Sequence, residues 1–380
     1  MSKRYCIFSA QYLPHMGGVE RYTYNIAKGL SDNGDKVTIV TNNTMQSRCY
    51  EEKKGIKVYR FPCYPLINGR FPVMKINKEF RKINHALKRE CFDEIIINAR
   101  FYIHSLYAAR YAKKRGIPCI CIEHGTSHLS VHNPILDKVG AIYEHFHTMI
   151  LKHYCKNYYG VSEACSQWSE HFHIKSKGVL YNAVDLEEIE RLKREQKRDF
   201  RKEYQIAEDE LVIAFTGRLL KEKGIYELVE TVERLNQNEK KVHLMLAGDG
   251  DEWEYVKKHA SQYIHPLGRI DFSEIIALLT QSDIFCLPSF SEGFSTSALE
   301  AAACNCYIIT TRRGGTKELI IQKEYGIVMD DNSTENIYQA LQYAVTHESE
   351  RKKACDLCYQ RLKDNFTWEK TVEKIRTEVY

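Results

Sequence analysis

The chain has 380 residues, 43% of which are hydrophobic, and a formal net charge of +5. A chain of this length is expected to form two domains, because a single hydrophobic core rarely grows to this size. Its apolar runs are too short to cross a bilayer, and its N-terminus is typical of a strand, not of a signal peptide. We therefore expect a cytoplasmic protein, at most peripheral at the inner face of a membrane.

Cysteines are numerous but do not form a metal-binding pattern. There are 13 of them, scattered mostly through apolar segments. Zinc binding would need a second pair at suitable spacing near each CxC or CxxC pair, and none is found. Reduced, buried thiols and no metal site are expected. The pairs are Cys119/Cys121, Cys304/Cys306 and Cys355/Cys358.

Charge divides the chain into two unlike halves. Residues 1–180 hold 27 Lys and Arg against 14 Asp and Glu, whereas residues 181–380 hold 28 against 36. The two halves are therefore expected to meet different partners or surfaces.

Strand and helix patterns alternate along the whole chain, which predicts parallel sheets with helical crossovers. The charged stretch at 186–210 is typical of a linker with a helix, and we place the domain boundary just before it. An amphipathic pattern at 366–380 predicts a last helix that docks on a neighbour. Strands are predicted at 5–10, 36–41, 56–60, 94–99, 118–123, 158–161, 211–216, 242–247, 263–267, 284–287 and 306–310.

The segment 70–89 interleaves basic and apolar residues and contains a single acidic residue, Glu79. A basic amphipathic helix can lie on an anionic membrane. A surface helix that packs its apolar face on the core gives the same pattern. Both interpretations stay open.

Two features of the first half lie at predicted strand ends. Gly17 and Gly18 stand just before a helix, where they permit close approach of a ligand or of another domain. They do not form the G-x-G-x-x-G pattern of a dinucleotide site. His124 follows a buried strand directly and should face the crevice at the carboxyl end of the sheet. The alternative is a structural histidine whose ring nitrogens form hydrogen bonds within the core.

The second half places cations where a strand ends and a helix begins. Arg218 and Lys223 follow the strand at 211–216, an arrangement that suits a diphosphate. The alternative is that these cations are ordinary solvent-exposed side chains at the start of a helix. The sequence Gly248-Asp249-Gly250-Asp251 spells a DxD, but its glycines favour a tight turn between strand and helix.

A strand–loop–helix unit around Pro288 organises the C-terminal third. The apolar run 284–287 stops at Pro288, a polar loop follows, and a helix begins near 295–297. Glu292 lies in the loop and Glu300 in the first helical turns. Helical N–H groups here would point at the crevice where open α/β sheets bind ligands. Glu300 could instead close a capping box with Ser297.

Taken together, these residues resemble retaining glycosyltransferases of the GT-B fold, specifically glycosyltransferase family 4. The E-x7-E spacing of Glu292 and Glu300 is the most specific part of the resemblance. Its other parts are Gly17-Gly18-Val19-Glu20, His124-Gly125, Asn182 with Asp185, Gly217-Arg218 with Lys223-Gly224, Gly248-Asp249-Gly250, Gly293-Phe294 and Gly314-Gly315 with Glu318. Ala183 departs from the pattern, because a glycine is common there.

The resemblance implies two Rossmann-like α/β domains that face each other across a cleft. Residues 1–182 would bind the acceptor, residues 183–365 would bind the nucleotide sugar, and residues 366–380 would form a helix that packs back on the first domain. Catalytic roles would fall to Glu292, His124, Arg218 and Lys223. The donor would be bound by Gly17, Gly18, Arg218, Lys223, Glu292, Gly293, Phe294, Ser295 and Glu300.

Physical chemistry supports these roles. Departure of a nucleoside diphosphate leaves negative charge on the diphosphate and positive charge on the sugar, so fixed cations there can replace a metal. We expect a metal-independent enzyme without cofactors. It would transfer a sugar, with retention, to a saccharide or lipid-linked saccharide in surface polysaccharide or glycoconjugate synthesis. It could contact an anionic membrane surface, and no nucleic acid is expected as a partner.

A catalytically inactive binding or scaffold subunit on the same fold is the main alternative. The presence of Arg218, Lys223, Glu292 and Glu300 argues against it. A phosphorylase would need a lysine-bound pyridoxal site, which we cannot locate. The sequence names neither the sugar, the nucleotide nor the acceptor.

Overall fold

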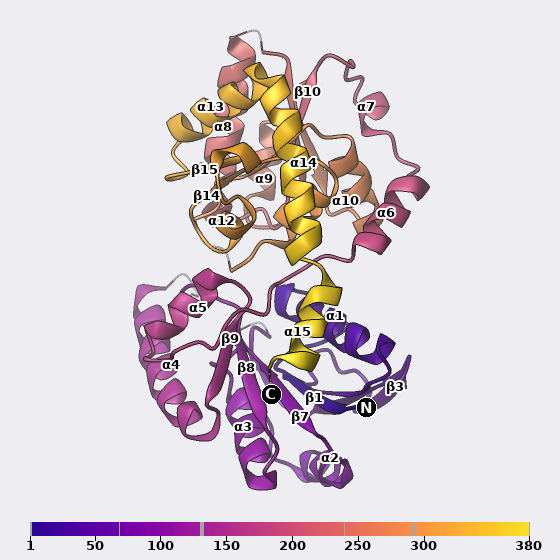
Figure 1. Cartoon of the computed structure of the whole chain (residues 1–380). Helices are drawn as coiled ribbons and strands as arrows, with labels where there is room; N and C mark the ends of the chain where they lie inside the picture. Colours follow the sequence, from indigo (N-terminus) through magenta and orange to yellow (C-terminus); the bar gives the residue numbers. More distant parts are fainter. Residues whose placement is uncertain (1, 68, 130–132, 239, 291–292, 380) are drawn as a thin grey trace. The chain divides into compact units, whose positions relative to one another are not determined.

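The computed structural model describes residues 2–67, 69–129, 133–238, 240–290 and 293–379. The chain divides into two compact units, which are drawn in Figure 1. Unit 1 comprises residues 1–182 together with 368–380, and unit 2 comprises residues 183–367. Glu292 lies outside the described residues.

Unit 1 is built on a seven-stranded sheet in the order β3-β4-β2-β1-β7-β8-β9. All neighbouring strands are parallel except β3, which runs antiparallel to β4. A two-stranded antiparallel hairpin, β5-β6, stands beside it. The strands are β1 Arg4–Ser9, β2 Lys36–Asn42, β3 Tyr50–Lys53, β4 Ile56–Phe61, β5 Cys63–Leu66, β6 Phe71–Met74, β7 Glu94–Asn98, β8 Cys119–Glu123 and β9 Asn157–Gly160.

The central strands of this sheet carry nearly continuous apolar runs, because helical crossovers cover both faces of a parallel sheet. Every residue of β7 and β8 is buried. The helices of unit 1 are α1 Gly18–Asp32, α2 Lys78–Arg89, α3 Ile103–Arg115, α4 Pro134–Tyr154, α5 Glu163–Glu170 and α15 Trp368–Thr377.

The last helix, α15, packs on α1 within unit 1. Trp368 meets Tyr22 edge to face, with ring centroids 5.4 Å apart. Arg376 forms an ion pair with the fully buried carboxylate of Asp35 at 2.8 Å. The apolar face predicted for this segment therefore lies against the neighbouring helix, as an amphipathic stripe requires.

Unit 2 is built on a six-stranded parallel sheet in the order β12-β11-β10-β13-β14-β15. Its strands are β10 Leu211–Thr216, β11 Val242–Ala247, β12 Ile264–Gly268, β13 Ile284–Leu287, β14 Tyr307–Thr311 and β15 Ile327–Met329. Its helices are α6 Leu186–Glu195, α7 Phe200–Glu203, η1 Lys221–Lys223, α8 Ile225–Gln237, α9 Trp253–Lys258, α10 Phe272–Thr280, α11 Thr296–Ala303, α12 Thr316–Leu319, η2 Lys323–Tyr325, α13 Thr334–Thr346 and α14 Glu348–Asn365.

The α/β class and the parallel sheets predicted from the sequence are confirmed. Every predicted strand is present, with ends shifted by at most one residue. All 13 cysteines are free thiols, and Cys91 is the one with an exposed side chain. No helix among the described residues is long and apolar enough to cross a membrane.

The basic segment at 70–89 is not one helix, which corrects the expectation of a continuous amphipathic helix. Its first part forms β6, and only Lys78–Arg89 is helical. The apolar residues of α2, Phe80, Ile83 and Leu87, are buried in the core cluster of unit 1. The surface-helix interpretation therefore holds for α2, and its apolar face is not available to a membrane.

We predict that Gly29→Ala destabilises the protein, although alanine is favoured over glycine in a helix by ~1 kcal/mol. A Cβ at Gly29 would lie 2.6 Å from Cγ2 of Val372, so α1 and α15 would have to separate. Overpacking of this kind costs ~1–3 kcal/mol. Chemical denaturation should give a lower free energy of unfolding for Gly29→Ala.

Val372→Ala provides the control for this prediction. Alone it leaves a small cavity and lowers stability, but in the Gly29→Ala background it should cost less or restore stability, because it removes the clashing methyl group. Additive losses in the double variant, or a rise in stability in Gly29→Ala alone, would contradict the packing argument.

Candidate active site

The carboxyl ends of β11, β10, β13 and β14 lie side by side at one edge of the second sheet. The loops that leave these four ends contain the predicted donor-site sequences. Ligands of open α/β sheets bind at such an edge. The fold of unit 2 thus brings together segments that are up to a hundred residues apart in the chain.

The loop after β10 touches the loop after β13 directly. The backbone N–H of Phe290 donates to the carbonyl of Glu222 at 2.7 Å, and the Ser289 hydroxyl donates to the same carbonyl at 3.3 Å. Gly224 stands at φ +70°, and a Cβ there would lie 2.4 Å from the carbonyl oxygen of Pro288. Glycine is therefore required where the two loops cross.

The Gly248–Gly250 turn packs on the loop after β10. A Cβ on Gly248 would lie 1.8 Å from the carbonyl oxygen of Gly217, and Gly248 has φ +150°. The Asp249 carboxylate accepts a hydrogen bond from the N–H of Gly250 at 2.8 Å, and the N–H of Trp253 closes the turn by donating to the carbonyl of Gly250 at 3.1 Å. This is the tight-turn conformation predicted for the DxD sequence.

The loop after β13 also contacts the loop after β14. The N–H of Gly315 donates to the carbonyl of Gly293 at 2.8 Å, and the Thr311 hydroxyl donates to the carbonyl of Ser289 at 2.5 Å. Glu318 follows in α12 and is buried. Gly314, Gly315 and Glu318, which the sequence singled out, therefore lie beside the loop that leads from β13 into α11, the helix that contains Glu300.

Ser295 is the N-cap of α11, and its hydroxyl accepts from the N–H of Ala298 at 3.3 Å. The helix thus begins where the sequence predicted, but the capping residue is Ser295 and not Ser297. The capping box of Ser297 with Glu300 is not formed, because both residues lie inside the helix. Glu300 is 3% exposed. A carboxylate buried this deeply has a specific role more often than a solvated one.

Arg218 and Lys223 flank the turn that leads from β10 into α8. Arg218 is exposed and Lys223 is half-buried. The backbone of Lys223 is fixed in the η1 turn, because its N–H donates to the carbonyl of Leu220 at 2.9 Å. Both cations thus lie at the carboxyl end of the central strand, beside the loop after β13. Phe294 and Ser295 in that loop are buried.

In unit 1, Gly17 and Gly18 open α1. Gly17 is the N-cap, and a Cβ there would lie 2.6 Å from the buried Glu20 carboxylate. A Cβ on Gly18 would meet nothing within 4 Å. A side chain at Gly17 would displace the end of the Glu20 side chain, whereas Gly18 leaves open space at the helix start, where N–H groups attract anions.

His124 follows β8 and is held by a chain of hydrogen bonds. The Asn98 side-chain N–H₂ donates to the Thr23 hydroxyl at 2.8 Å, which leaves the Asn98 carbonyl oxygen to accept from His124 Nε2 at 3.1 Å. The Thr23 hydroxyl donates in turn to the carbonyl of Val19 at 2.8 Å. This chain assigns the proton to Nε2 and leaves Nδ1 as an acceptor.

The imidazole of His124 also packs edge to face on Tyr22, with centroids 4.9 Å apart. Desolvation lowers the pKa of His124 to about 3. The side chain is therefore neutral at physiological pH and offers hydrogen bonds, not positive charge.

A buried ion-pair cluster lies behind His124 and was not predicted from the sequence. Arg100 is 1% exposed and pairs with Glu123 at 2.6 Å and with Glu144 at 2.9 Å. Glu123 also accepts from the backbone N–H groups of His124 and Gly125 at 3.0 and 3.2 Å. The position of Arg100 just after β7 and of Glu123 at the end of β8 was the available signal, because such strand ends meet at one edge.

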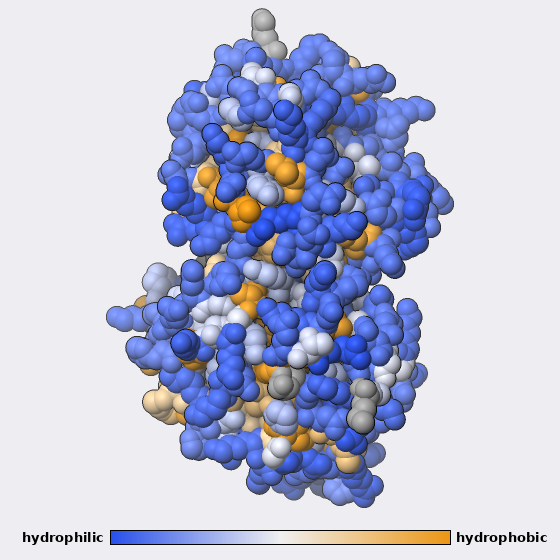
Figure 2. All heavy atoms as spheres, in the orientation of Figure 1, coloured by the Kyte–Doolittle hydropathy of each residue, from blue (hydrophilic) through white to orange (hydrophobic). Residues whose placement is uncertain are grey.

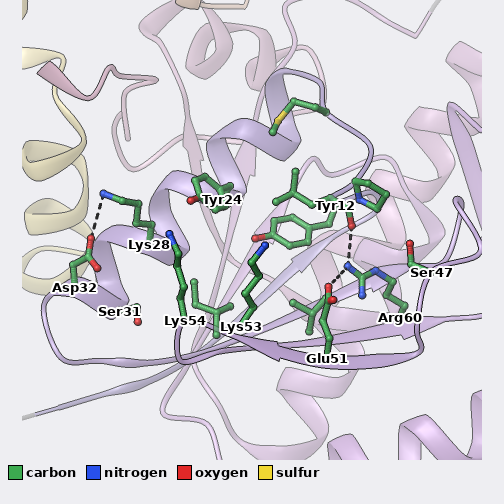
Figure 3. A pocket seen from close by; sticks show the side chains of 15 residues that line it. Tyr12, Tyr24, Lys28, Ser31, Asp32, Ser47, Glu51, Lys53, Lys54 and Arg60 are labelled. Atoms are coloured by element: carbon green, nitrogen blue, oxygen red, sulfur yellow. Dashed lines mark hydrogen bonds and ion pairs between the residues drawn. The ribbon is translucent and has the colours of Figure 1, made fainter. Parts of the chain in front are cut away.

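A cavity of about 730 Å³ lies beside α1 in unit 1. Figure 3 shows Tyr24 and Lys28 of α1 on one side, Tyr12 on the other, and the side chains of Lys53 and Lys54 between them. The buried Arg60 closes one end, where it binds the carbonyl of Leu13 and the carboxylate of Glu51. Aromatic rings and lysines of this kind suit a polar ligand with apolar faces or negative charge.

Comparison with known families covers both units. The sequence profile "Glycosyltransferase Family 4" matches residues 16–188, and the profile "Glycosyl transferases group 1" matches residues 196–356. The "Uncharacterized glycosyltransferase MJ1069" of Methanocaldococcus jannaschii is 27% identical, over 97% of this chain and 96% of that protein. The "Phosphatidylinositol N-acetylglucosaminyltransferase GPI3 subunit" of Saccharomyces cerevisiae is 25% identical, over 88% of this chain and 73% of that protein.

Solved structures share the architecture of the whole chain. The complex of Anabaena Alr3699/HepE with UDP has a TM-score of 0.74 at 17% identity, covering 99% of this chain and 98% of that one. The sucrose-phosphate synthase of Thermosynechococcus elongatus has a TM-score of 0.75 at 16% identity, covering 98% and 97%. With both halves matched by sequence and the fold matched by structure, this chain belongs to the group 1 and family 4 glycosyltransferases of the GT-B fold.

Proposed function

We propose that this glycosyltransferase moves a hexosyl group, with retention of configuration, from a nucleotide-diphosphate sugar to a saccharide or lipid-linked saccharide acceptor. The observation that carries the proposal is the junction of the loops after β10, β13 and β14 in unit 2. It sets two cations, two helix starts and a buried carboxylate at the carboxyl edge of one sheet. A nucleoside diphosphate offers the matching groups, two phosphates and a ribose diol.

Each residue of this junction has a proposed task. Arg218 and Lys223 stabilise the charge that develops on the departing diphosphate. Glu300 accepts hydrogen bonds from the ribose hydroxyls, and the backbone of 293–295 lies against the phosphates at the start of α11. Glu292, outside the described residues, is assigned to the donor sugar on the family resemblance alone. The structurally similar Anabaena Alr3699/HepE forms complexes with UDP and with UDP-glucose, which supports a nucleotide-sugar donor.

His124 is proposed to accept a hydrogen bond from a hydroxyl of the transferred sugar. Its neutral state and its fixed tautomer support this role, because Nδ1 is left as the acceptor. A neutral imidazole also avoids placing a second positive charge near an oxocarbenium-like sugar. Retention by same-face displacement rests on the family resemblance.

We propose the cavity beside α1 as the acceptor site. It begins at the loop after β1, next to Gly17, and runs along α1. Tyr12 and Tyr24 supply faces on which a sugar can stack, and Lys53 and Lys54 would favour a phosphorylated acceptor.

An inactive scaffold subunit on this fold is the competing function. Some relatives carry the name of a subunit, and the yeast GPI3 protein, at 25% identity, is one of them. The donor junction in unit 2 favours an active enzyme over this alternative, since a scaffold has no need for cations placed together at a strand end.

We further propose that α4 docks on an anionic membrane. Its exposed apolar residues recur at spacings of three and four, which places them on one helix face. Ile142 is 64% exposed and Phe146 60%. The other members of this apolar stripe are Ile135, Leu136, Val139 and Met149. Elsewhere, the face drawn in Figure 2 is mainly hydrophilic, with apolar side chains in small separate patches.

Cations lie beside the stripe. The exposed run Lys113–Arg115 ends α3, and the Lys113 ammonium group donates to the carbonyl of His153 near the end of α4 at 3.1 Å. Lys138 is exposed on α4 itself. Apolar residues flanked by cations are typical of helices that lie in the interface of an anionic bilayer. This location would bring the enzyme to a lipid-linked acceptor.

We predict that Lys223→Ala lowers turnover ~10²–10³-fold, because it removes a charge contact made mainly in the transition state. The donor is first identified by a thermal-shift screen of nucleotides and nucleotide sugars, in which the true ligand raises the midpoint. Turnover is then measured as nucleoside diphosphate released from that donor.

Lys221→Ala is the matched control, since Lys221 is an exposed lysine on the same η1 turn. It should change turnover only a few-fold, and both variants should keep the wild-type melting temperature. Normal turnover in Lys223→Ala, or no donor-dependent shift with any nucleotide sugar in the wild type, would favour the scaffold alternative.

A second prediction is that transfer survives chelation by EDTA. In this proposal the two cations replace a metal at the diphosphate, and the Asp249 carboxylate accepts from the N–H of the neighbouring Gly250. Release of nucleoside diphosphate should be unchanged after treatment with EDTA and gel filtration. Loss of activity with recovery on adding Mn²⁺ or Mg²⁺ would reassign the Asp249–Asp251 turn as a metal site.

A third prediction is that the protein sediments with anionic vesicles and that the double variant Ile142→Asp/Phe146→Asp does not. Burial of each large apolar side chain contributes ~1.5–3 kcal/mol, so the double variant should partition at least ~tenfold less. Leu357→Asp, on an exposed apolar residue of α14, is the control and should bind normally.

Binding to vesicles of phosphatidylglycerol and phosphatidylcholine should exceed binding to pure phosphatidylcholine and weaken as salt rises. If the wild type stays in the supernatant and instead forms a dimer that the double variant cannot form, the stripe contacts a second copy and the membrane proposal is wrong.

A further inference from the structure

Three histidines of unit 1 bring their ring nitrogens together at a point that the proposed transfer reaction does not use. His128 follows β8, His145 lies on α4, and His171 follows α5. The Nε2 atoms of His128 and His171 are 3.2 Å apart, and those of His145 and His171 are 3.1 Å apart. Three separate segments of the chain therefore aim a nitrogen at one place.

These distances match the ligand spacing of a zinc ion. Zinc binds imidazole nitrogen at 2.0–2.1 Å with tetrahedral geometry, which puts two such nitrogens about 3.3–3.4 Å apart. The separations from His171 Nε2 to those of His128 and His145 are within about 0.3 Å of this value. All three ligand atoms lie within 4.8 Å of one another.

A buried carboxylate orients the first of these ligands. Nδ1 of His128 lies 3.2 Å from Glu144, which is 2% exposed and is held by Arg100. This carboxylate lies on the Nδ1 side of the ring, so an ion bound at Nε2 would leave the Nδ1 proton facing Glu144. Histidine ligands of metals are usually fixed by a carboxylate in this way.

Hydrogen bonds alone satisfy this cluster poorly. In the tautomer whose proton is on Nδ1, the nitrogen that lies toward Glu144, neutral His128 can only accept at Nε2, so His171 must donate to it. The single proton on His171 Nε2 cannot also serve the contact with His145 in good geometry. A cation at the common point satisfies all three lone pairs at once.

The ring of His171 is also held in place. It stacks on Trp168 with centroids 4.7 Å apart and planes 10° apart. His145 and His171 are exposed and His128 is half-buried, so an ion can enter from solvent. Zinc sites with three protein ligands keep a fourth position for water or substrate.

We propose that His128, His145 and His171 bind one Zn²⁺ ion. The ion fastens the segment after β8, which begins at His124, to α4 and to the end of α5. This site is separate from the donor junction and does not depend on the proposed function.

The test uses the full-length protein, free of any affinity tag and of metal, titrated with Zn²⁺ by calorimetry and with Co²⁺ by absorption spectroscopy. We expect one Zn²⁺ per chain and a tetrahedral Co²⁺ spectrum without a thiolate charge-transfer band. His145→Ala and His171→Ala should each weaken binding at least ~tenfold, as loss of ligands or their supports does in other metal sites. Both side chains are exposed, so these variants should fold normally.

His85→Ala, on an exposed histidine of α2, and Cys91→Ser, on the exposed thiol, are matched controls that should bind as the wild type does. The proposal is overturned if the wild type binds no Zn²⁺ at 100 μM (a concentration chosen as about the upper limit for a specific site). It is equally overturned if the double variant His145→Ala/His171→Ala binds unchanged, if Cys91→Ser abolishes binding, or if the cluster takes inorganic phosphate and not Zn²⁺.

Discussion

The buried guanidinium of Arg100 is the contact on which the functional half of unit 1 depends. It joins Glu123 at the end of β8 to Glu144 on α4, and its plane lies 3.5 Å over the ring centre of Phe172. Burial raises the pKa of Glu123, although Arg100 acts in the opposite direction. Removing one partner of such a cluster strands a buried charge and typically costs ~3–5 kcal/mol. The cluster therefore fixes the strand end, the helix and the loop between them as one piece.

The described loops at the carboxyl edge of the sheet in unit 2 are fixed mainly by backbone contacts. These loops are fixed by glycines whose neighbours leave no room for a side chain, as at Gly224 against Pro288 and Gly248 against Gly217. Backbone hydrogen bonds then tie the loops together in pairs. This construction leaves the side chains of Arg218 and Lys223 accessible, which suits groups that must meet a charged ligand. A fully buried cation, by contrast, is stable only when it is paired within the protein.

The sequence predicted what depends on local pattern and missed what depends on distant contacts. Apolar runs identified most of the parallel strands, whereas β3, β5, β6 and β15 have only three or four residues each and were not predicted. The loops after β10, β13 and β14 were expected to meet at one sheet edge, because strand ends in a parallel sheet do so, and their role as a donor site stays a prediction. The segment 70–89 shows the opposite case, since amphipathicity reveals an apolar face but not what covers it. Likewise, nothing in the spacing of His128, His145 and His171 indicates that they converge.

Stability alone does not explain the three buried charges of Arg100, Glu123 and Glu144. Apolar side chains of similar size often replace such clusters with no loss of stability. Here, however, Glu123 accepts from the N–H groups of His124 and Gly125, and Glu144 accepts from the N–H of Leu129 and faces His128. An apolar replacement would leave these N–H groups without their acceptors, at ~1–3 kcal/mol for each buried one. The cluster therefore fixes the position of the segment from His124 to Leu129. That segment carries both His124, the neutral histidine of the proposed transfer, and His128, the first ligand of the proposed zinc site.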